Sequence, residues 1–496
     1  MIFSLETLLQ LCIILPIVST IGIIALRHNQ NLREMVSIAT SLIVLCSVMF
    51  IYLGLESGES ISVHWLQILP GLNVSFSVEP LGMIFALIAS FLWLITIIYA
   101  VGYMRGHNED HQTRFFCCFA VAIGGVMGVA FADNLLTLFI FYEVLTLSTY
   151  PLVTHAGTDA AKKGGRVYLG ILLSTSIAFF LFAILGTWVI AGTLDFTQGG
   201  VFPEDANTTL LGFLLVLFIF GIGKAAIMPF HRWLPAAMVA PTPVSALLHA
   251  VAVVKAGVFT VMKVSVLIFG IDLLSILPTT QPLLYLAGTS VLLASFIAMR
   301  QDNLKARLAY STIGQLGYIT IGALLASSMG VIGGSMHIAM HAFGKITLFF
   351  CAGAILVAAH KTKVSQLDGL GRRMPFTMAA FFIASLGIIG IPPAGGTWSK
   401  WYLLMGSLNT EQWTILVILI LSSLLNIAYL LPIPIRAFLF KESTTSSALG
   451  IKEAPFACLI AIGITTIGIV ALFMYPARLY DLASSILQTS SIAHGQ

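Results

Sequence analysis

Long apolar stretches follow one another along almost the whole chain, separated by short polar connections. About 20 apolar residues are enough for a helix to cross the roughly 30 Å of hydrocarbon in a bilayer. The pattern therefore predicts an all-α integral membrane protein with about 14 transmembrane helices. The predicted spans are residues 5–26, 35–54, 77–103, 115–131, 134–153, 167–192, 208–228, 244–268, 283–299, 306–326, 331–358, 376–407, 413–433 and 455–475.

Composition and charge placement agree with this interpretation. The chain has 496 residues, of which 58% are hydrophobic and 9% charged, a composition outside the range of soluble domains. If the N-terminus faces outward, 18 of the 24 Lys and Arg residues lie in inner loops, Arg33 among them, whereas acidic residues such as Glu79 collect in outer loops. The asymmetry predicts a multi-pass protein of a bacterial inner membrane with both termini outside. The net charge of +4 follows from this orientation and does not indicate nucleic-acid binding.

Several titratable residues remain inside the predicted spans. Each charge at the centre of a membrane helix costs about 3 kcal/mol, so we expect these side chains to face protein or water. For each lysine the alternatives are snorkelling to an interface or a static ion pair, and snorkelling is favoured for Lys263 near the outer end of its span. The group comprises Lys224, Lys255, Lys263, Lys345 and Lys400, together with the acidic Glu143 in "LFIFYEVLTLS".

Histidines accompany the lysines in two of these spans. The stretch "SMHIAMHAFGKITLFF" places His337, His341 and Lys345 four residues apart, on one face of a helix. His249 precedes Lys255 by six residues, so water could connect their side chains, although a lone histidine could equally be structural. Burial disfavours a charged lysine, and histidine titrates near neutral pH. Together these groups indicate a proton relay.

The same pattern argues against a metal site or a bound cofactor. No acid or cysteine stands near the histidine ladder to complete a metal site. The chain has no Walker loop, no dinucleotide-binding fingerprint after a strand and no iron–sulfur or haem motif. We expect neither a metal nor a cofactor.

Two of the spans contain residues that interrupt helices. "GKAAIMPFHRWLPAAMVAPTPVSALLHA" carries Pro229 and Pro235 at the end of the seventh span, and "GIIGIPPAGGTWSKWYLLMG" carries two prolines and two glycines within the twelfth. Breaks five spans apart lie in helices that cross in opposite directions, which predicts two inverted five-helix repeats, spans 4–8 and 9–13. The alternative is that Pro and Gly are simply common in membrane helices. The predicted units are residues 1–110 (helices 1–3), 111–270 and 271–440 (the two repeats) and 441–496 (helix 14 and a short tail).

Four motifs carry a resemblance to a known family. "GIGKAAIMPFHRWLPAAMVAPTPVSALLHA", "RLAYSTIGQLGYI", "HAFGKITLFF" and "FYEVLTLSTYPL" closely resemble the antiporter-like membrane subunits of Mrp-type cation/proton antiporters, of respiratory complex I (subunits L, M and N) and of membrane-bound hydrogenases. The resemblance covers residues from about 75 to 440. It implies a fold of fourteen helices with two inverted repeats, and a hydrated polar axis near mid-membrane along which protons move.

The resemblance also implies roles for individual residues. Glu143 and Lys224 match a pair whose opening and closing drives or gates proton movement, and Lys255 matches a bridging lysine on the eighth helix. Lys400 matches the terminal lysine of the broken twelfth helix, which exchanges protons with the outer side or the next subunit. His337, His341 and Lys345 fall at the connection on the eleventh helix.

The particular member of the family is less sharply defined. The C-terminal tail is too short for the long lateral helix of the L subunit, and Lys400 stands where the M subunit usually has glutamate. The length suits the Mrp D subunit or the complex I N subunit, although "PTPVSALLHAVAVVKAGVF" looks more like the L or A type. We expect a protein similar to the Mrp D subunit, with other membrane subunits as partners and protons and Na⁺ as transported ions.

Other functions remain open at this point. They are a proton-pumping subunit of NADH-quinone oxidoreductase or of a hydrogenase, the proton-conducting partner of an inorganic-carbon uptake complex, and a non-transporting scaffold in which the lysines are structural. The chain has no convincing carboxylate cage for Na⁺, because such hard cations prefer several oxygen ligands and Glu143 stands alone.

Overall fold

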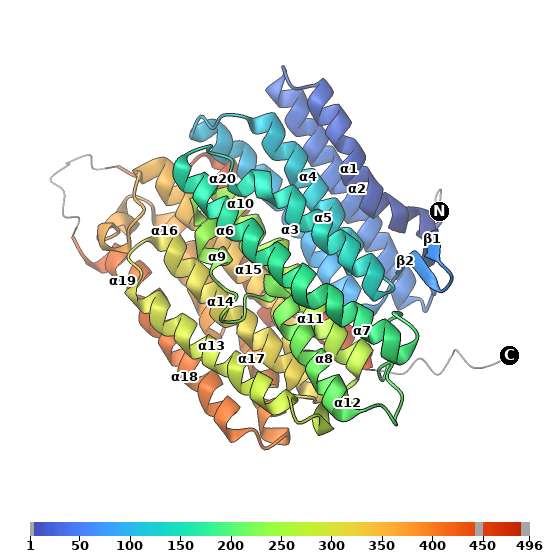
Figure 1. Ribbon diagram of the computed structural model, residues 1–496. Coiled ribbons are helices and arrows are strands. Elements are labelled where there is room, and N and C mark those ends of the chain that lie inside the picture. Colours follow the sequence, from blue (N-terminus) through green and yellow to red (C-terminus); the bar gives the residue numbers. More distant parts are fainter. Residues whose placement is uncertain (1–3, 442–449, 488–496) are drawn as a thin grey trace.

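The computed structural model describes residues 4–441 and 450–487, which form a bundle of packed helices (Figure 1). At one end of the bundle lie α1 (Leu5–Ala25) and α2 (Gln30–Glu56), and at the other α13 (Thr280–Arg300) and α18 (Trp413–Leu430), with α15 (Ser328–Ala359) between them. Residues 488–496, the end of the predicted C-terminal tail, lie outside the described part. The prediction that both chain ends face outward therefore also concerns residues outside it.

The predicted apolar stretches coincide with helices to within a few residues at most boundaries. The other helices are α3 (Pro80–Gly106), α4 (Gln112–Ala130), α5 (Leu135–Val153), α6 (Asp159–Thr175), α7 (Leu181–Ala191), α8 (Thr208–Gly221), α9 (Trp233–Ala236), α10 (Thr242–Ala246), α11 (Val253–Val264), α12 (Ile271–Ile276), α14 (Leu304–Leu324), α16 (Pro375–Ile389), α17 (Gly396–Asn409), α19 (Pro432–Leu439), α20 (Phe456–Met474) and α21 (Ala477–Ser484). Short π-helical segments, Ser176–Phe180, Leu247–Val251 and Ser265–Phe269, link some of them.

The helical membrane fold is confirmed. Within the described residues, 11 helical segments are long and apolar enough to cross a membrane. The exact number of fourteen crossings, the inverted repeats and the boundaries of the four units stay predictions.

One short element departs from the all-helical expectation. Strands β1 (Ser62–Leu69) and β2 (Leu72–Ser77) form an antiparallel hairpin between α2 and α3. Gly71 allows the tight turn because its φ is +80°, a conformation that costs little only without a side chain. The sequence analysis did not predict this hairpin, because its residues form the short connection between two long apolar stretches.

Two segments that carry lysines and histidines, Thr242–Phe269 and α15, are among the most enclosed of the described structure. In the segment Thr242–Phe269 the most apolar window is 100% buried, against 33% in α1. The long helix α15 is likewise enclosed, because α3, α11, α14, α16, α17 and α20 pack around it. Polar groups on these helices therefore face other helices and not the hydrocarbon.

Both predicted interruptions are present. Helix α8 ends at Gly221, well before Pro229, so the prolines do not mark where the helix stops. Lys224 consequently lies inside the break, in the 3₁₀ turn Gly223–Ala225, and not in the helix before it as the sequence predicted. In the second interruption α16 ends at Ile389 and α17 begins at Gly396, as expected.

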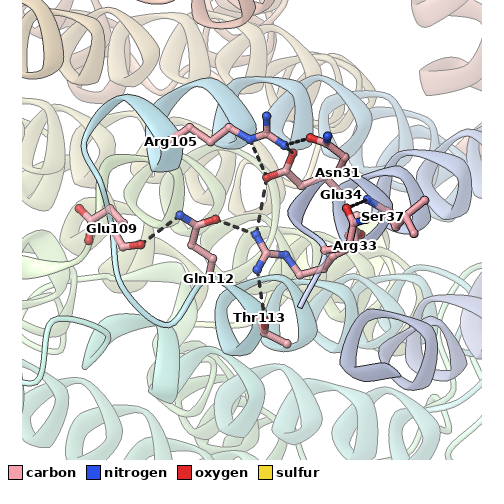
Figure 2. Close-up of polar contacts among 10 residues, drawn as sticks. Asn31, Arg33, Glu34, Ser37, Arg105, Glu109, Gln112 and Thr113 are labelled. Carbon is pink, nitrogen blue, oxygen red and sulfur yellow. Dashed lines mark hydrogen bonds and ion pairs between the residues drawn. The ribbon is translucent and has the colours of Figure 1, made fainter. Parts of the chain in front are cut away.

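A polar cluster fastens the first helices to the bundle. Glu34 on α2 accepts two hydrogen bonds from Arg105 on α3, at 2.5 and 3.1 Å, and lies 3.6 Å from Arg33. Arg33 donates to Gln112 at 2.7 Å and to Thr113 at 3.2 Å, both at the start of α4 (Figure 2). Arg33 lies within α2 and is buried, 4% exposed, so its predicted placement in a loop was wrong. The cluster joins three helices through one carboxylate.

Replacing that carboxylate tests its structural role. We expect Glu34→Gln to lower the free energy of unfolding by roughly 3 kcal/mol, because it leaves a buried arginine without its counter-charge. Thermal unfolding of the detergent-purified protein measures the change. Asp159→Asn is the matched control. Asp159 is fully exposed, and its ion pair with Lys162 at 4.0 Å lies on the surface, so its loss should cost little. Equal melting temperatures for the two variants would contradict this role.

Candidate functional site

Lys224 is held in the helix break by the turn of α5 opposite it. Its Nζ donates to the main-chain oxygen of Tyr142 at 2.9 Å and to Thr146 Oγ1 at 2.6 Å, and lies 3.1 Å from the centre of the Tyr142 ring. The main-chain N–H of Lys224 donates to the Tyr142 hydroxyl at 3.1 Å. Trp233 Nε1 donates to the main-chain oxygen of Gly223 at 3.0 Å, which also accepts from the N–H of Ala226. The break thus satisfies its own polar groups while it holds a fully buried lysine.

Glu143 lies close by but does not pair with Lys224, in contrast to the implied ion pair. Both carboxylate oxygens of Glu143 are buried and have no hydrogen-bond partner in the described part of the chain. The reason is geometric, because Tyr142 and Thr146 on the same helix take the lysine instead. In this conformation the two groups are separate.

The ladder on α15 reaches helices on both sides of it. His341 Nδ1 contacts Lys255 Nζ on α11. His337 Nδ1 lies 2.8 Å from Ser399 Oγ on α17, and its Nε2 lies 3.1 Å from Gln315 Oε1 on α14. The two histidine rings stack with 5.8 Å between centroids. His337 thus has hydrogen-bonding groups at both ring nitrogens.

Two further lysines flank the ladder. Lys345 donates to Ser311 Oγ at 2.6 Å, and Ser311 Oγ also accepts from Tyr429 at 2.8 Å. Lys400 donates to the main-chain oxygen of Ile389 at 2.9 Å and to Ser423 Oγ at 3.1 Å. Ile389 is the last residue of α16. Among the described residues, the hydrogen-bond partners of both lysines are therefore all neutral.

An aromatic ring links Lys400 to the histidines. Lys400 Nζ lies 4.6 Å from the ring centre of Tyr318, and the same ring stacks on His337 at 5.6 Å. A line of contacts consequently runs from Lys400 through Tyr318, His337 and His341 to Lys255. Lys400 also lines a pocket of about 280 Å³ between α17 and α18.

The line is interrupted between Lys255 and Lys224. No hydrogen bond joins the two lysines in the described structure, although their helices touch. A Cβ added to Gly257 would lie 2.3 Å from the main-chain carbon of Lys224, so only glycine lets α11 approach the break this closely. His249 lies in the π-helical segment before α11, fully buried, with both ring nitrogens unpartnered among the described residues and its ring 4.9 Å from Phe349.

Lys263 has a different environment from the other lysines, and its expected snorkelling was wrong. It is 0% exposed, forms an ion pair with Glu79 at 2.5 Å and donates to the main-chain oxygen of Ala132 at 2.6 Å. Its Nζ also lies 4.2 Å from the ring centre of Phe196. Glu79 directly precedes α3, so this pair fastens α11 to the start of α3.

Several polar partners were missed by the sequence reasoning. Ser311, Gln315 and Tyr318 occur at positions i, i+4 and i+7 of α14, on one face of the helix. That spacing was a detectable signal. Thr146, Ser399 and Ser423 gave none, because single hydroxyl residues are common in membrane helices.

The fold and the buried cations define a polytopic membrane protein with a polar interior, and comparison with known proteins identifies the group to which it belongs. The family described as "NADH:quinone oxidoreductase/Mrp antiporter, TM" matches residues 132–426. The family described as "NADH-Ubiquinone oxidoreductase (complex I), chain 5 N-terminus" matches residues 65–116. The chain belongs to the NADH:quinone oxidoreductase/Mrp antiporter family of membrane subunits.

Relatives come from both branches of the family. NADH-quinone oxidoreductase subunit N of Desulforudis audaxviator is 31% identical over 374 residues, covering 75% of this chain and 74% of the relative. The probable A/B subunit of a K⁺/H⁺ antiporter of Rhizobium meliloti is 32% identical over 409 residues, which are 80% of this chain but 39% of that longer protein.

Two solved complexes contain chains with the same fold. A chain of the Mrp complex from Dietzia sp. aligns with a TM-score of 0.86 at 21% identity, covering 98% of this chain and 97% of that one. A chain of the membrane-bound sulfane sulfur reductase, an archaeal respiratory membrane complex, aligns with a TM-score of 0.84 at 22% identity over 97% of this chain and 98% of that one.

The ion pair at Lys263 gives a test that separates it from the other lysines. We expect Lys263→Met to lower the free energy of unfolding by about 2 kcal/mol, since it leaves the partly buried Glu79 without its cation. Adding Glu79→Gln should restore part of the loss, and thermal unfolding measures both. The control is Lys162→Met, a side chain 62% exposed. A double variant less stable than Lys263→Met would contradict the pairing.

Proposed function

We propose that this chain is the proton-translocating subunit of a multisubunit monovalent cation/proton antiporter, similar to the Mrp D subunit. The observation that carries the proposal is the line of buried groups from Lys255 through His341 and His337 to Tyr318 and Lys400. The 32% identity with the probable A/B subunit of a K⁺/H⁺ antiporter, over 80% of this chain, supports the antiporter assignment.

The line suits proton transfer better than static stabilisation. A structural buried cation normally has an anionic partner, as Lys263 has in Glu79. Lys224, Lys345 and Lys400 instead bind hydroxyl and carbonyl oxygens, so losing the proton leaves no unpaired carboxylate behind. A lysine in such a site changes between its charged and neutral forms at small cost compared with a lysine in an ion pair.

The histidines provide the step between the two lysine sites. His337 faces Gln315 with one nitrogen and Ser399 with the other, so it can take up a proton at one side of the ring and release it at the other. His341 contacts Lys255 with Nδ1, and its Nε2 has no partner among the described residues. Protons would therefore move along α15 between the site at Lys255 and the site at Lys400.

Water would complete the path where side chains do not touch. Several unpartnered buried polar atoms of the described chain lie near this line, including both oxygens of Glu143, both ring nitrogens of His249 and Nε2 of His341. Buried polar groups in proteins normally have partners, and internal water supplies them where protein does not. Glu143 would modulate Lys224, because a carboxylate that approaches a lysine favours its charged form.

A second function is a proton-pumping subunit of a redox-driven complex. Its specific support is the similarity to subunit N of an NADH-quinone oxidoreductase, at 31% identity over three quarters of both chains. The two functions share the path but differ in the energy source, which is an ion gradient in one and electron transfer in partner chains in the other. In both, other membrane subunits complete the complex.

Loss of Lys224 tests the proton path. We expect Lys224→Ala in the intact complex to reduce ΔpH-driven exchange in everted vesicles at least tenfold, because it removes the proton-binding group in the first helix break. A pH-sensitive dye measures the dissipation of ΔpH on adding Na⁺ or K⁺. Lys162→Ala is the matched control, as Lys162 is an exposed lysine at the start of α6.

The outcomes distinguish the candidate functions. Undiminished exchange by Lys224→Ala in an intact complex would contradict the relay and favour a scaffold. Wild-type vesicles in which neither Na⁺ nor K⁺ dissipates ΔpH, but in which a quinone substrate generates it, would replace the antiporter by the redox-driven function.

A further inference from the structure

An apolar groove opens beside α2 and α3. It has a volume of about 540 Å³ and lies between α2, α3, α15, α20 and α21. Its walls are the faces of α2 and α3 that include Leu45, Met49, Leu87 and Phe91, and its floor includes Phe343 of α15. The described residues that line this groove include none of the relay residues, so it is separate from the path proposed above.

The depth of the groove matches half a bilayer. Along α2 its lining runs from Glu56 to Leu45, a distance of about 16 Å at 1.5 Å per residue. The hydrocarbon of a bilayer is about 30 Å thick, so the groove covers one leaflet. A transmembrane helix of a partner subunit would need a groove across both leaflets, whereas one lipid molecule occupies one.

The open end of the groove is polar. A smaller pocket of about 250 Å³ adjoins it and shares Tyr52, Glu56, Arg478 and Leu482 with it. Arg478 donates to Glu56 Oε1 at 2.9 Å, yet its side chain is 80% exposed. A guanidinium group has five N–H donors, so donors remain for a second anion. Apolar walls below and a cation at the rim are the complement of an acyl chain with a phosphate head.

The helix at the rim fits the same depth. Helix α21 follows α20 after a short turn and presents Leu479 and Leu482 to the groove, while Asp481 is exposed. Short amphipathic helices of this kind lie at the level of the lipid headgroups. Arg478 is therefore placed where a phosphate of the same leaflet lies.

We propose that this groove binds one phospholipid of the surrounding membrane. An acyl chain lies along α2 and α3 against Phe343, and the phosphate is held by Arg478. Phe343 belongs to α15, the helix that also carries His337 and His341. The acyl chain therefore packs against the side of α15 that faces away from the two histidines. The occupant is a membrane lipid and not a soluble phosphate, since the apolar walls make up most of the site.

Photolabelling of the purified complex in phosphatidylglycerol nanodiscs tests the proposal. The probe is a phosphatidylglycerol with a photoactivatable group on one acyl chain, and labelled peptides are identified by mass spectrometry. We expect labelling concentrated on residues 45–56 of α2 and 84–91 of α3. Arg478→Gln should reduce it about fivefold, as expected for loss of one charged hydrogen bond at an exposed site. Leu87→Trp, which puts a larger side chain into the groove, should also reduce it.

The control variant carries the same new side chain elsewhere. Val189→Trp changes a residue of α7 that is 81% exposed and should leave the labelling of α2 and α3 unchanged. Labelling spread evenly over α7, α18 and the groove would overturn the proposal, as would cross-links from the groove to a partner subunit. Arg478 is exposed, so Arg478→Gln tests the site even if Leu87→Trp fails to fold. If Arg478→Gln is labelled as strongly as the wild type, Arg478 does not hold the phosphate and the proposal is overturned. Competition by soluble glycerol phosphate would contradict the membrane source.

Discussion

The organisation of this protein depends on the cost of holding ammonium groups inside a membrane. Five lysines at about 3 kcal/mol each would cost about 15 kcal/mol if they faced lipid. The structure avoids this by placing all five in the interior, where Lys224, Lys255, Lys263 and Lys345 are fully buried and Lys400 is 6% exposed. A carboxylate pairs with Lys263, and the described partners of the other four are neutral. That difference separates the structural lysine from the candidates for proton transfer.

The interruptions in the helices follow from the same constraint. A helix that stops inside the membrane leaves carbonyl groups without partners, and the negative end of its dipole attracts a cation. Lys400 uses the last carbonyl of α16 in this way. Lys224 lies in the break itself, where Tyr142 supplies both a carbonyl and a ring face. The breaks therefore place the lysines and solvate them without an anion.

Residue spacing predicted the parts of this arrangement that are local in sequence. The four-residue spacing of His337, His341 and Lys345 placed the ladder on α15. The Pro and Gly cluster located the second break, whereas the first begins at Gly221, before its prolines. Partners from other helices, such as Ser399 for His337 and Glu79 for Lys263, are far apart in sequence and depend on helix packing. The same holds for Glu143, whose oxygens have no hydrogen-bond partner among the described residues, so its gating pair with Lys224 stays a prediction. In the folded chain Tyr142 and Thr146 accept the hydrogen bonds of the Lys224 ammonium group in place of Glu143.

In the proposed path protons pass along α15 between the two lysine sites, and His341 is the step on which the path depends because it links Lys255 to His337. The most direct measurement is proton flux through the reconstituted complex with His341→Phe, compared with His341→Ala. Phenylalanine fills the ring's space and excludes water, whereas alanine leaves room for water to bridge Lys255 and His337. The account predicts near-complete loss of flux with phenylalanine and partial loss with alanine, in complexes of unchanged composition. Equal and undiminished flux in both variants would contradict it.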